Sequence, residues 1–242
     1  MVSHTIRSPD RKAVHQLFDR DPESHRFTGQ VERRAHLVAE ILADCRPRTL
    51  LDVGAGDGRV SLPFACPGSK VTLVEISATM VAAARKNVRE EQEPYVDFVV
   101  QDLITLSESK QFDVLLCLGV LAHVADVPLC LQKISRLVAA GGIAILQLTD
   151  GSTLLGGLEY LATVRGRRNR GYSFNRLSSR MVTNHLQALG LSLANERRYF
   201  SFTTGRRGGG KGPNDVLWKA VSKISEPFGG ERLLVYRKGE AS

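Results

Sequence analysis

Three glycines at alternate positions follow a short apolar run in the segment LLDVGAGDGRV, residues 50–60. Glycine has no Cβ, so a turn of this kind between a strand and a helix brings the backbone close to a ligand and commonly binds nucleotides. The dinucleotide pattern G-x-G-x-x-G needs a small residue where this chain has Arg59. Asp52 precedes the turn and would repel a pyrophosphate. The segment therefore indicates a ligand other than a dinucleotide, with cationic groups.

Two further acids follow the next two apolar runs of the chain. Glu75 ends KVTLVE (70–75), 23 residues after Asp52, where a carboxylate accepts hydrogen bonds from ribose hydroxyls. Asp102 follows the run at 95–100, within reach of an adenine amino group; the alternatives are a solvent-facing acid at Glu75 and a helix N-cap at Asp102. The carboxyl ends of successive parallel strands share one crevice. The three acids together predict a nucleoside site there.

The elements that must hold these residues alternate between strand and helix. Alternation of this kind predicts an α/β fold with a doubly wound, parallel sheet. Ser77 is expected to cap one helix, and Gly141 with Gly142 to end another. The expected strands are 49–54, 70–75, 95–100, 112–119 and 142–149, and the expected helices are 9–18, 30–45, 59–65, 77–91 and 126–139.

The last part of the chain adds a helix and two strands. We expect a helix at 178–189 ended by Gly190, and two strands that pair antiparallel at the edge of the sheet. These strands are 191–200 and 231–238, and a short helix at 215–224 lies between them. The chain is therefore expected to form a single domain, 1–242, with N-terminal helices (1–46), a ligand-binding core (47–150) and a substrate-side region (151–242). Residues 9–29 are expected to close over the ligand.

Five segments resemble, in order, the successive motifs of class I S-adenosylmethionine-dependent methyltransferases. The resemblance covers residues 30–150 and extends in element order to the end of the chain. It implies a Rossmann-like, seven-stranded sheet, mostly parallel with an antiparallel last strand. It also implies S-adenosyl-L-methionine as cofactor and S-adenosyl-L-homocysteine as product. The segments are LDVGAGDGRV, LVEIS, VVQDL, FDVLLCLGVLAHV and LVAAGGIAIL.

The resemblance also implies which residues bind the cofactor. By position, the glycine turn would surround the methionine portion, the acid after the second strand would hold the ribose, and the acid after the third would face the adenine. The end of the fourth strand would lie near the methionine amino group. The residues implied are Asp52, Gly54, Ala55, Gly56, Glu75, Ile76, Asp102, Leu103, Leu118 and Gly119.

The segment LGVLAHVAD (118–126) lies where members of this family contact the methyl acceptor. It lacks the [N/D]-P-P-[Y/F] motif of enzymes that methylate amino groups of adenine or glutamine. It resembles the G-V-L-E-H-V of the small-molecule branch, with Ala122 in place of Glu. His123 is placed to act as general base, because an imidazole titrates near neutral pH; the alternatives are that it caps the next helix or packs beneath the cofactor. Further candidates for the acceptor pocket are Tyr160, Arg170, Tyr172 and Phe174.

The excess of positive charge lies entirely in the last part of the chain. Residues 151–242 hold 16 of the 33 Lys+Arg and 6 of the 25 Asp+Glu, so their net charge is +10 and that of the first 150 residues is −2. Such asymmetry indicates an anionic partner or a solvated basic surface. The basic segments 165–170 and 206–211 could follow an RNA backbone, but few aromatic residues accompany them. A small anionic or carrier-linked substrate is the favoured acceptor, and contact with a membrane surface stays open.

The cysteines and the apolar runs bear on location. The four cysteines show no CxxC spacing, so a metal cluster or a disulfide framework is not expected, and reduced thiols are typical of a cytoplasmic protein. No apolar run reaches the roughly 20 residues needed to span a bilayer. The prediction is a cytoplasmic methyltransferase acting on a small biosynthetic substrate, on oxygen rather than nitrogen. The alternatives are an RNA methyltransferase and a non-catalytic cofactor-binding protein.

Overall fold

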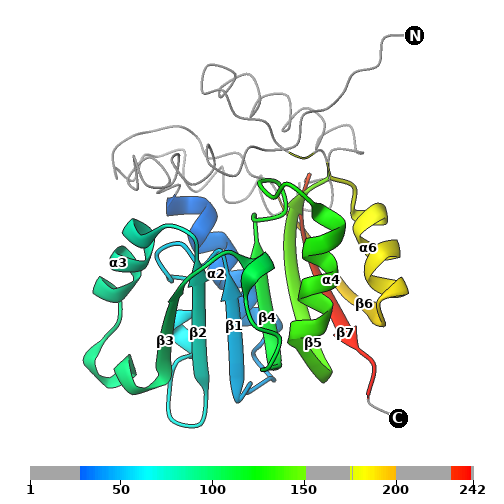
Figure 1. Cartoon of the computed structure of the whole chain (residues 1–242). Helices are drawn as coiled ribbons and strands as arrows, with labels where there is room; N and C mark the ends of the chain where they lie inside the picture. The colour runs from blue at the N-terminus through cyan, green and yellow to red at the C-terminus, as the bar shows by residue number, and fades with distance from the viewer. Residues whose placement is uncertain (1–27, 151–174, 176, 200–229, 241–242) are drawn as a thin grey trace, which may run out of the picture.

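The computed structural model describes residues 28–150, 175, 177–199 and 230–240. Seven strands form one sheet in the order β3-β2-β1-β4-β5-β7-β6 (Figure 1). Strands β1 to β5 pair in parallel, and β7 runs antiparallel to both β5 and β6. This confirms the predicted mostly parallel, seven-stranded sheet. The strands are β1 (Thr49–Val53), β2 (Lys70–Glu75), β3 (Val96–Val100), β4 (Phe112–Leu118), β5 (Val138–Thr149), β6 (Leu191–Tyr199) and β7 (Glu231–Lys238).

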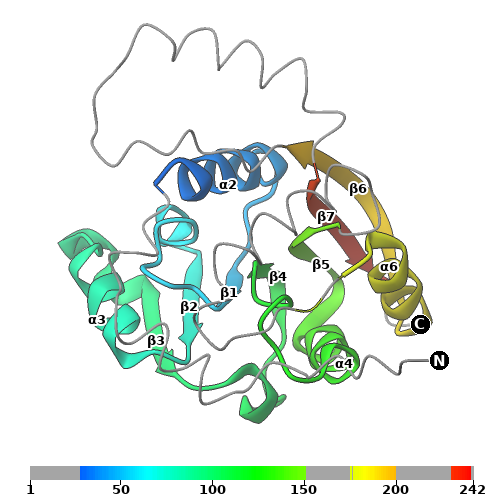
Figure 2. The same cartoon turned by 90° about the horizontal axis from the view of Figure 1, so that it is seen from above.

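Helices cover both faces of this sheet. In Figures 1 and 2, α2 lies on one face, and α4 and α6 lie on the other. The central strands are therefore buried on both sides, which explains why β1 and β4 read as continuous apolar runs rather than alternating ones. The α-helices are α2 (Thr28–Ile41), α3 (Ala78–Lys86), α4 (Val127–Leu137) and α6 (Ser179–Ala188), and the 3₁₀ helices are η1 (Leu62–Phe64), η2 (Glu90–Tyr95) and η3 (Leu103–Thr105).

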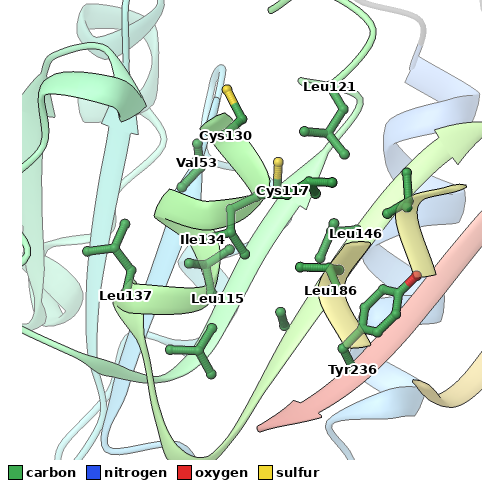
Figure 3. Packing of buried hydrophobic residues seen from close by; sticks show 14 of the residues in the cluster. Val53, Leu115, Cys117, Leu121, Cys130, Ile134, Leu137, Leu146, Leu186 and Tyr236 are labelled. Atoms are coloured by element: carbon green, nitrogen blue, oxygen red, sulfur yellow. The ribbon is translucent and has the colours of Figure 1, made fainter. Parts of the chain in front are cut away.

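Each face of the sheet has its own apolar core. On one side, Leu37 and Val38 of α2 pack with residues of β1, β2 and β4. On the other, α4 packs its Cys130, Ile134 and Leu137 toward β4 (Figure 3). All four cysteines of the chain are free thiols, and burial raises the pKa of Cys130 to about 12. Within the described ranges, no helix is long and apolar enough to cross a membrane.

The predicted end of the helix at 126–139 is wrong. Helix α4 ends at Leu137, and β5 begins at the next residue, so Gly141 and Gly142 lie inside a strand. The register between β4 and β5 shifts between Phe112 and Val114, and Gly141 has a φ of 71° there. A Cβ on Gly142 would lie 2.9 Å from two carbonyl oxygens, so both glycines serve an irregularity of the sheet.

Two other predicted helices are shorter than expected. The one at 59–65 is reduced to the 3₁₀ helix η1, and the one at 77–91 ends at Lys86. Ser77 caps α3 as predicted, because its side chain accepts from the Met80 amide at 3.2 Å. Several predictions lie outside the described residues: the helices at 9–18 and 215–224, the closure by 9–29, the basic segments 165–170 and 206–211, and Tyr160, Arg170, Tyr172 and Phe174.

Candidate functional site

The glycine turn after β1 is shaped by backbone conformation and by one tight contact. Gly54, Gly56 and Gly58 have φ values of 67°, 57° and 75°, which favour glycine. The Gly54 amide donates to the Val74 carbonyl at 2.8 Å, which joins the turn to β2. A Cβ on Gly54 would overlap Cγ2 of Val120, in the segment that follows β4. Glycine at this position therefore lets two ligand-facing segments touch.

Glu75, at the end of β2, joins the turn to the next segment of the chain. One carboxylate oxygen accepts from the Gly56 amide at 3.0 Å, and the other accepts from the amides of Ile76 and Ser77 at 2.8 and 3.0 Å. The side chain is buried, which excludes the solvent-facing alternative. These amides fix the orientation of the carboxylate at the cavity described below.

Asp52, at the floor of the turn, is 3% exposed. Burial raises the pKa of this carboxyl to about 7; the Ser61 hydroxyl opposes the shift, and the Glu75 carboxylate adds to it. A cationic group beside Asp52 would favour the ionised form and lower the pKa again. A ligand with a positively charged group next to Asp52 is therefore expected to bind here more tightly than a neutral one.

Asp102 both caps a helix and lines the cavity. Its Oδ1 accepts from the Ile104 amide at 2.8 Å, so the N-cap alternative is correct for η3. The carboxylate nevertheless lies at the carboxyl end of β3, beside the residues that follow β2. A capping role and a ligand-facing position are therefore compatible in this residue.

The segment after β4 also reaches the site. Gly119 has a φ of 80°, and the His123 amide donates to the Val120 carbonyl at 2.8 Å, which closes a turn. Asp126 caps α4, because its Oδ1 accepts from the Leu129 amide at 2.9 Å. The alternative that His123 caps this helix is therefore wrong. His123 instead lines the cavity.

A cavity of about 520 Å³ lies at the carboxyl ends of β1 to β4. Its volume is within the range of about 300 to 1,000 Å³ typical of small-molecule and cofactor sites. All eleven residues predicted for the site line it, although their roles stay predictions: Asp52, Gly54, Ala55, Gly56, Glu75, Ile76, Asp102, Leu103, Leu118, Gly119 and His123. Within the described part of the chain, no group of three or more His, Cys, Asp or Glu could hold a metal ion.

Arg34 of α2 is a cavity residue that the sequence reasoning missed. Its terminal nitrogens lie 3.5 and 3.6 Å from where a Cβ on Gly119 would be, and its buried Nε has no hydrogen-bond partner among the residues that the structure describes. A signal was present in the sequence: Arg34 follows Val31 by three positions and precedes Val38 by four, so it lies on the inward face of the helix. A cation on an inward face indicates an anionic group of a ligand.

Comparison with known proteins supports the family resemblance. Residues 51–146 match the family model described as "Methyltransferase domain". The chain is similar to proteins named "Ubiquinone biosynthesis O-methyltransferase": it is 32% identical over 111 residues to that of Nitrosomonas europaea, and 33% identical over 94 residues to that of Coxiella burnetii. The alignments cover 45% and 38% of this chain, and 47% and 40% of the relatives. The chain therefore spans less than half the length of these relatives.

Solved structures share the fold over nearly the whole chain. Magnesium protoporphyrin IX methyltransferase from Synechocystis, crystallised with S-adenosylhomocysteine, has a TM-score of 0.67 and 22% identity, with 95% of this chain and 100% of that chain covered. An N-methyltransferase from Bradyrhizobium japonicum, in complex with the same compound, has a TM-score of 0.63 and 13% identity, with 94% and 100% covered. The predicted Rossmann-like fold and the resemblance to class I methyltransferases are confirmed.

Proposed function

We infer from the methyltransferase domain at residues 51–146 that this chain is a class I S-adenosylmethionine-dependent methyltransferase. One observation carries the inference: the acids at or just after the carboxyl ends of β1, β2 and β3 line one cavity together with the glycine turn. When bound, the cofactor supplies a methyl group attached to a sulfonium sulfur, and the neutral thioether that remains is a good leaving group.

The residues of the cavity fit the parts of this cofactor. Glu75, oriented by three backbone amides, would accept hydrogen bonds from the ribose hydroxyls. Ile76 and Leu103, which line the cavity, would pack against the adenine, and Asp102 would face its edge. A carboxylate that lies at a strand end, buried and already oriented, recognises a diol without further ordering.

The methionine portion would lie between Asp52 and Arg34. Asp52 and the backbone of Gly119 attract the amino group, and Asp52 becomes ionised when that positive charge is present. Arg34 binds the carboxylate, which supplies the partner that its buried Nε lacks within the described structure. The two ends of the zwitterion thus meet opposite charges on α2 and β1.

The chain itself contributes alignment and proton removal to the reaction. Methyl transfer is an in-line displacement, so the acceptor atom, the methyl group and the sulfur must lie on one line. His123, on the cavity wall, takes the proton from an acceptor hydroxyl. No protein side chain has to form a covalent bond.

A small, anionic acceptor that is methylated on oxygen is the favoured substrate class. The name of the curated relatives supports oxygen, and the net charge of +10 in residues 151–242 supports an anionic or carrier-linked molecule. The cytoplasmic location inferred from the cysteines stays a prediction. RNA is the competing explanation of the basic residues.

Calorimetry with S-adenosylhomocysteine tests cofactor binding. We expect wild-type protein to bind, and Glu75→Ala to weaken binding at least about tenfold, because hydrogen bonds to a charged group contribute about 1.5–3 kcal/mol. Glu91→Ala, at an exposed acid of η2, is the matched control and should bind as wild type does. Absence of binding by wild-type protein with a normal circular dichroism spectrum would overturn the methyltransferase assignment and favour a non-catalytic protein that keeps this fold for another role.

Transfer of a labelled methyl group tests the substrate class. Protein and S-adenosylmethionine with a tritiated methyl group are mixed separately with phenolic acids, aliphatic carboxylic acids, primary amines and total RNA. We expect label on an acid, at a phenol or carboxyl oxygen. Label on RNA alone would overturn the small-molecule assignment, and label on amines alone would overturn the preference for oxygen.

A further inference from the structure

Asn175, which is distant in the sequence, forms hydrogen bonds to the backbone of the loop that carries His123. The side-chain nitrogen of Asn175 donates to the carbonyls of Leu121 and Val124 at 2.9 and 2.7 Å. The Asn175 backbone amide donates to the Ala122 carbonyl at 2.9 Å. Three carbonyls within four residues thus point to a single residue.

These hydrogen bonds act on the part of the loop that faces the cavity. Val120, His123 and Val124 line the cavity, while Leu121 points the other way and is fully buried in the core (Figure 3). With the carbonyls on both sides of His123 fixed, the direction of its Cα–Cβ bond is fixed as well. The loop therefore presents His123 from a rigid backbone.

Asn175 can hold the loop because the chain after it is anchored to the sheet. Leu177 is buried and forms a parallel bridge with Asp150, just beyond the end of β5. The Ser179 hydroxyl donates to the Asp150 carboxylate at 2.5 Å, and Arg232 pairs with the same carboxylate at 3.0 Å. The hydrogen bonds of Asn175 thus tie the loop after β4 to the end of β5.

We propose that Asn175 is a positioning residue of the acceptor side, which sets the orientation of His123 through three hydrogen bonds to the loop 120–124. The proposal rests on the proposed function for its catalytic meaning, but its structural content does not. The side chain needs a donor of this length: aspartate has the same shape and no N–H, so it would place a carboxylate against two carbonyl oxygens.

Hydrogen exchange measured by mass spectrometry tests the positioning directly. In Asn175→Asp we expect the amides of residues 119–126 to exchange at least about tenfold faster, because local opening no longer breaks two hydrogen bonds. Peptides from β1, β2 and β4 should be unchanged. Asn184→Asp, at an exposed position of α6, is the matched control and should leave the loop at the wild-type rate. Unchanged exchange of the loop in folded Asn175→Asp would overturn the proposal.

Binding and turnover separate positioning from general damage. Asn175→Asp should bind S-adenosylhomocysteine within about threefold of wild type, because its hydrogen bonds go to Leu121, Ala122 and Val124, none of which is assigned to the cofactor. For the acceptor that the labelling experiment identifies, kcat should fall more than KM rises. Faster exchange throughout the chain would also overturn the proposal, since it would mean a global effect. Should wild-type protein fail to bind S-adenosylhomocysteine, the proposed function fails, and the exchange result still decides whether Asn175 holds the loop.

Discussion

At the scale of single residues, Asp52 links the site to pH. Burial raises its pKa to about 7, and the ligand's amino group favours its ionised form. We therefore expect the affinity for S-adenosylhomocysteine to rise by about tenfold between pH 6 and pH 8, since one pKa unit corresponds to about 1.4 kcal/mol. Calorimetry at pH 6, 7 and 8 measures this. Asp52→Asn should flatten the rise, and an equal rise in that variant would contradict the assignment.

The titration of Asp52 also changes the stability of the protein without ligand. Stability falls as the pH rises, whereas the affinity for the ligand increases. The folded state holds the Asp52 proton up to about pH 7, whereas the unfolded chain releases it near the ordinary value of 3.8. The folded state therefore binds more protons between these values, and the free energy of unfolding falls as the pH rises through this window, then levels off. Urea unfolding at pH 5 and pH 8 should show a smaller fall in Asp52→Asn than in wild type.

Two ligands that differ in their carboxylate can show whether Arg34 binds this group or supports the fold. Arg34→Gln should weaken S-adenosylhomocysteine by about tenfold to a hundredfold, the loss expected for one charged hydrogen bond. It should leave methylthioadenosine unchanged, because that nucleoside has no carboxylate. Arg46→Gln, at an exposed position after α2, is the control. Equal weakening of both ligands would show that Arg34 supports the fold rather than the carboxylate.

At the scale of elements, the turn after β1 lies against the segment after β4, and this contact limits which residues can replace Gly54. Gly54→Ala and Gly68→Ala both place alanine at a positive φ, of 67° and 86°. Among the residues that the structure describes, a Cβ on Gly54 would meet Val120, while a Cβ on Gly68 would have no neighbour within 4 Å. We expect Gly68→Ala to lose about 1 kcal/mol and Gly54→Ala about 1–3 kcal/mol more in urea unfolding.

A second substitution, in the segment after β4, should restore part of the stability that Gly54→Ala loses. In Gly54→Ala with Val120→Ala, the Cγ2 atom that a new Cβ would meet is gone, so the additional loss should shrink toward that of Gly68→Ala. Losses that simply add in the double variant would show that strain at Gly54, and not its contact with Val120, dominates.

The bounds of an element could be predicted from the sequence where neighbouring residues alone determine them. Strands β2 and β7 have the predicted bounds, because charged residues stand at both ends of each apolar run. The prediction failed at Gly141 and Gly142, where two glycines resemble a helix end but serve an irregular pairing with β4. That pairing joins residues far apart in the sequence, so no local pattern contains it.

The site residues that lie at the ends of strands could be predicted from the sequence. Asp52, Glu75 and Asp102 lie at or just after the carboxyl ends of adjacent parallel strands, so sheet topology alone brings them together. Arg34 and Asn175 come from elements outside this rule, one before the sheet and one after β5. Their positions depend on how α2 packs and on which carbonyls lie near residue 175. The division of the chain at 46 and 150 stays a prediction.

At the scale of the whole molecule, buried charges tie the C-terminal strands to the rest of the sheet. Arg232 of β7 is 7% exposed and pairs with Asp150, which is 1% exposed, and with Glu196 of β6. Arg232→Met should reduce the free energy of unfolding by about 3–5 kcal/mol, because it removes a buried cation that pairs with the buried Asp150 carboxylate. Lys70→Met removes an exposed pair with Asp97 and should cost less than about 1 kcal/mol. Similar losses in the two variants would contradict the buried pairing.

The position of β7 between β5 and β6 has a consequence for biosynthesis. A ribosome releases β6 before β7, yet among the described strands β6 pairs only with β7. From the moment Tyr199 emerges until Lys238 follows, β6 and β5 both lack β7, the strand that lies between them in the described sheet. The five parallel strands can assemble earlier, during translation, because each finds its neighbours among residues already made. Completion of this sheet is therefore a late event, and stalled nascent chains would expose two strand edges to their surroundings.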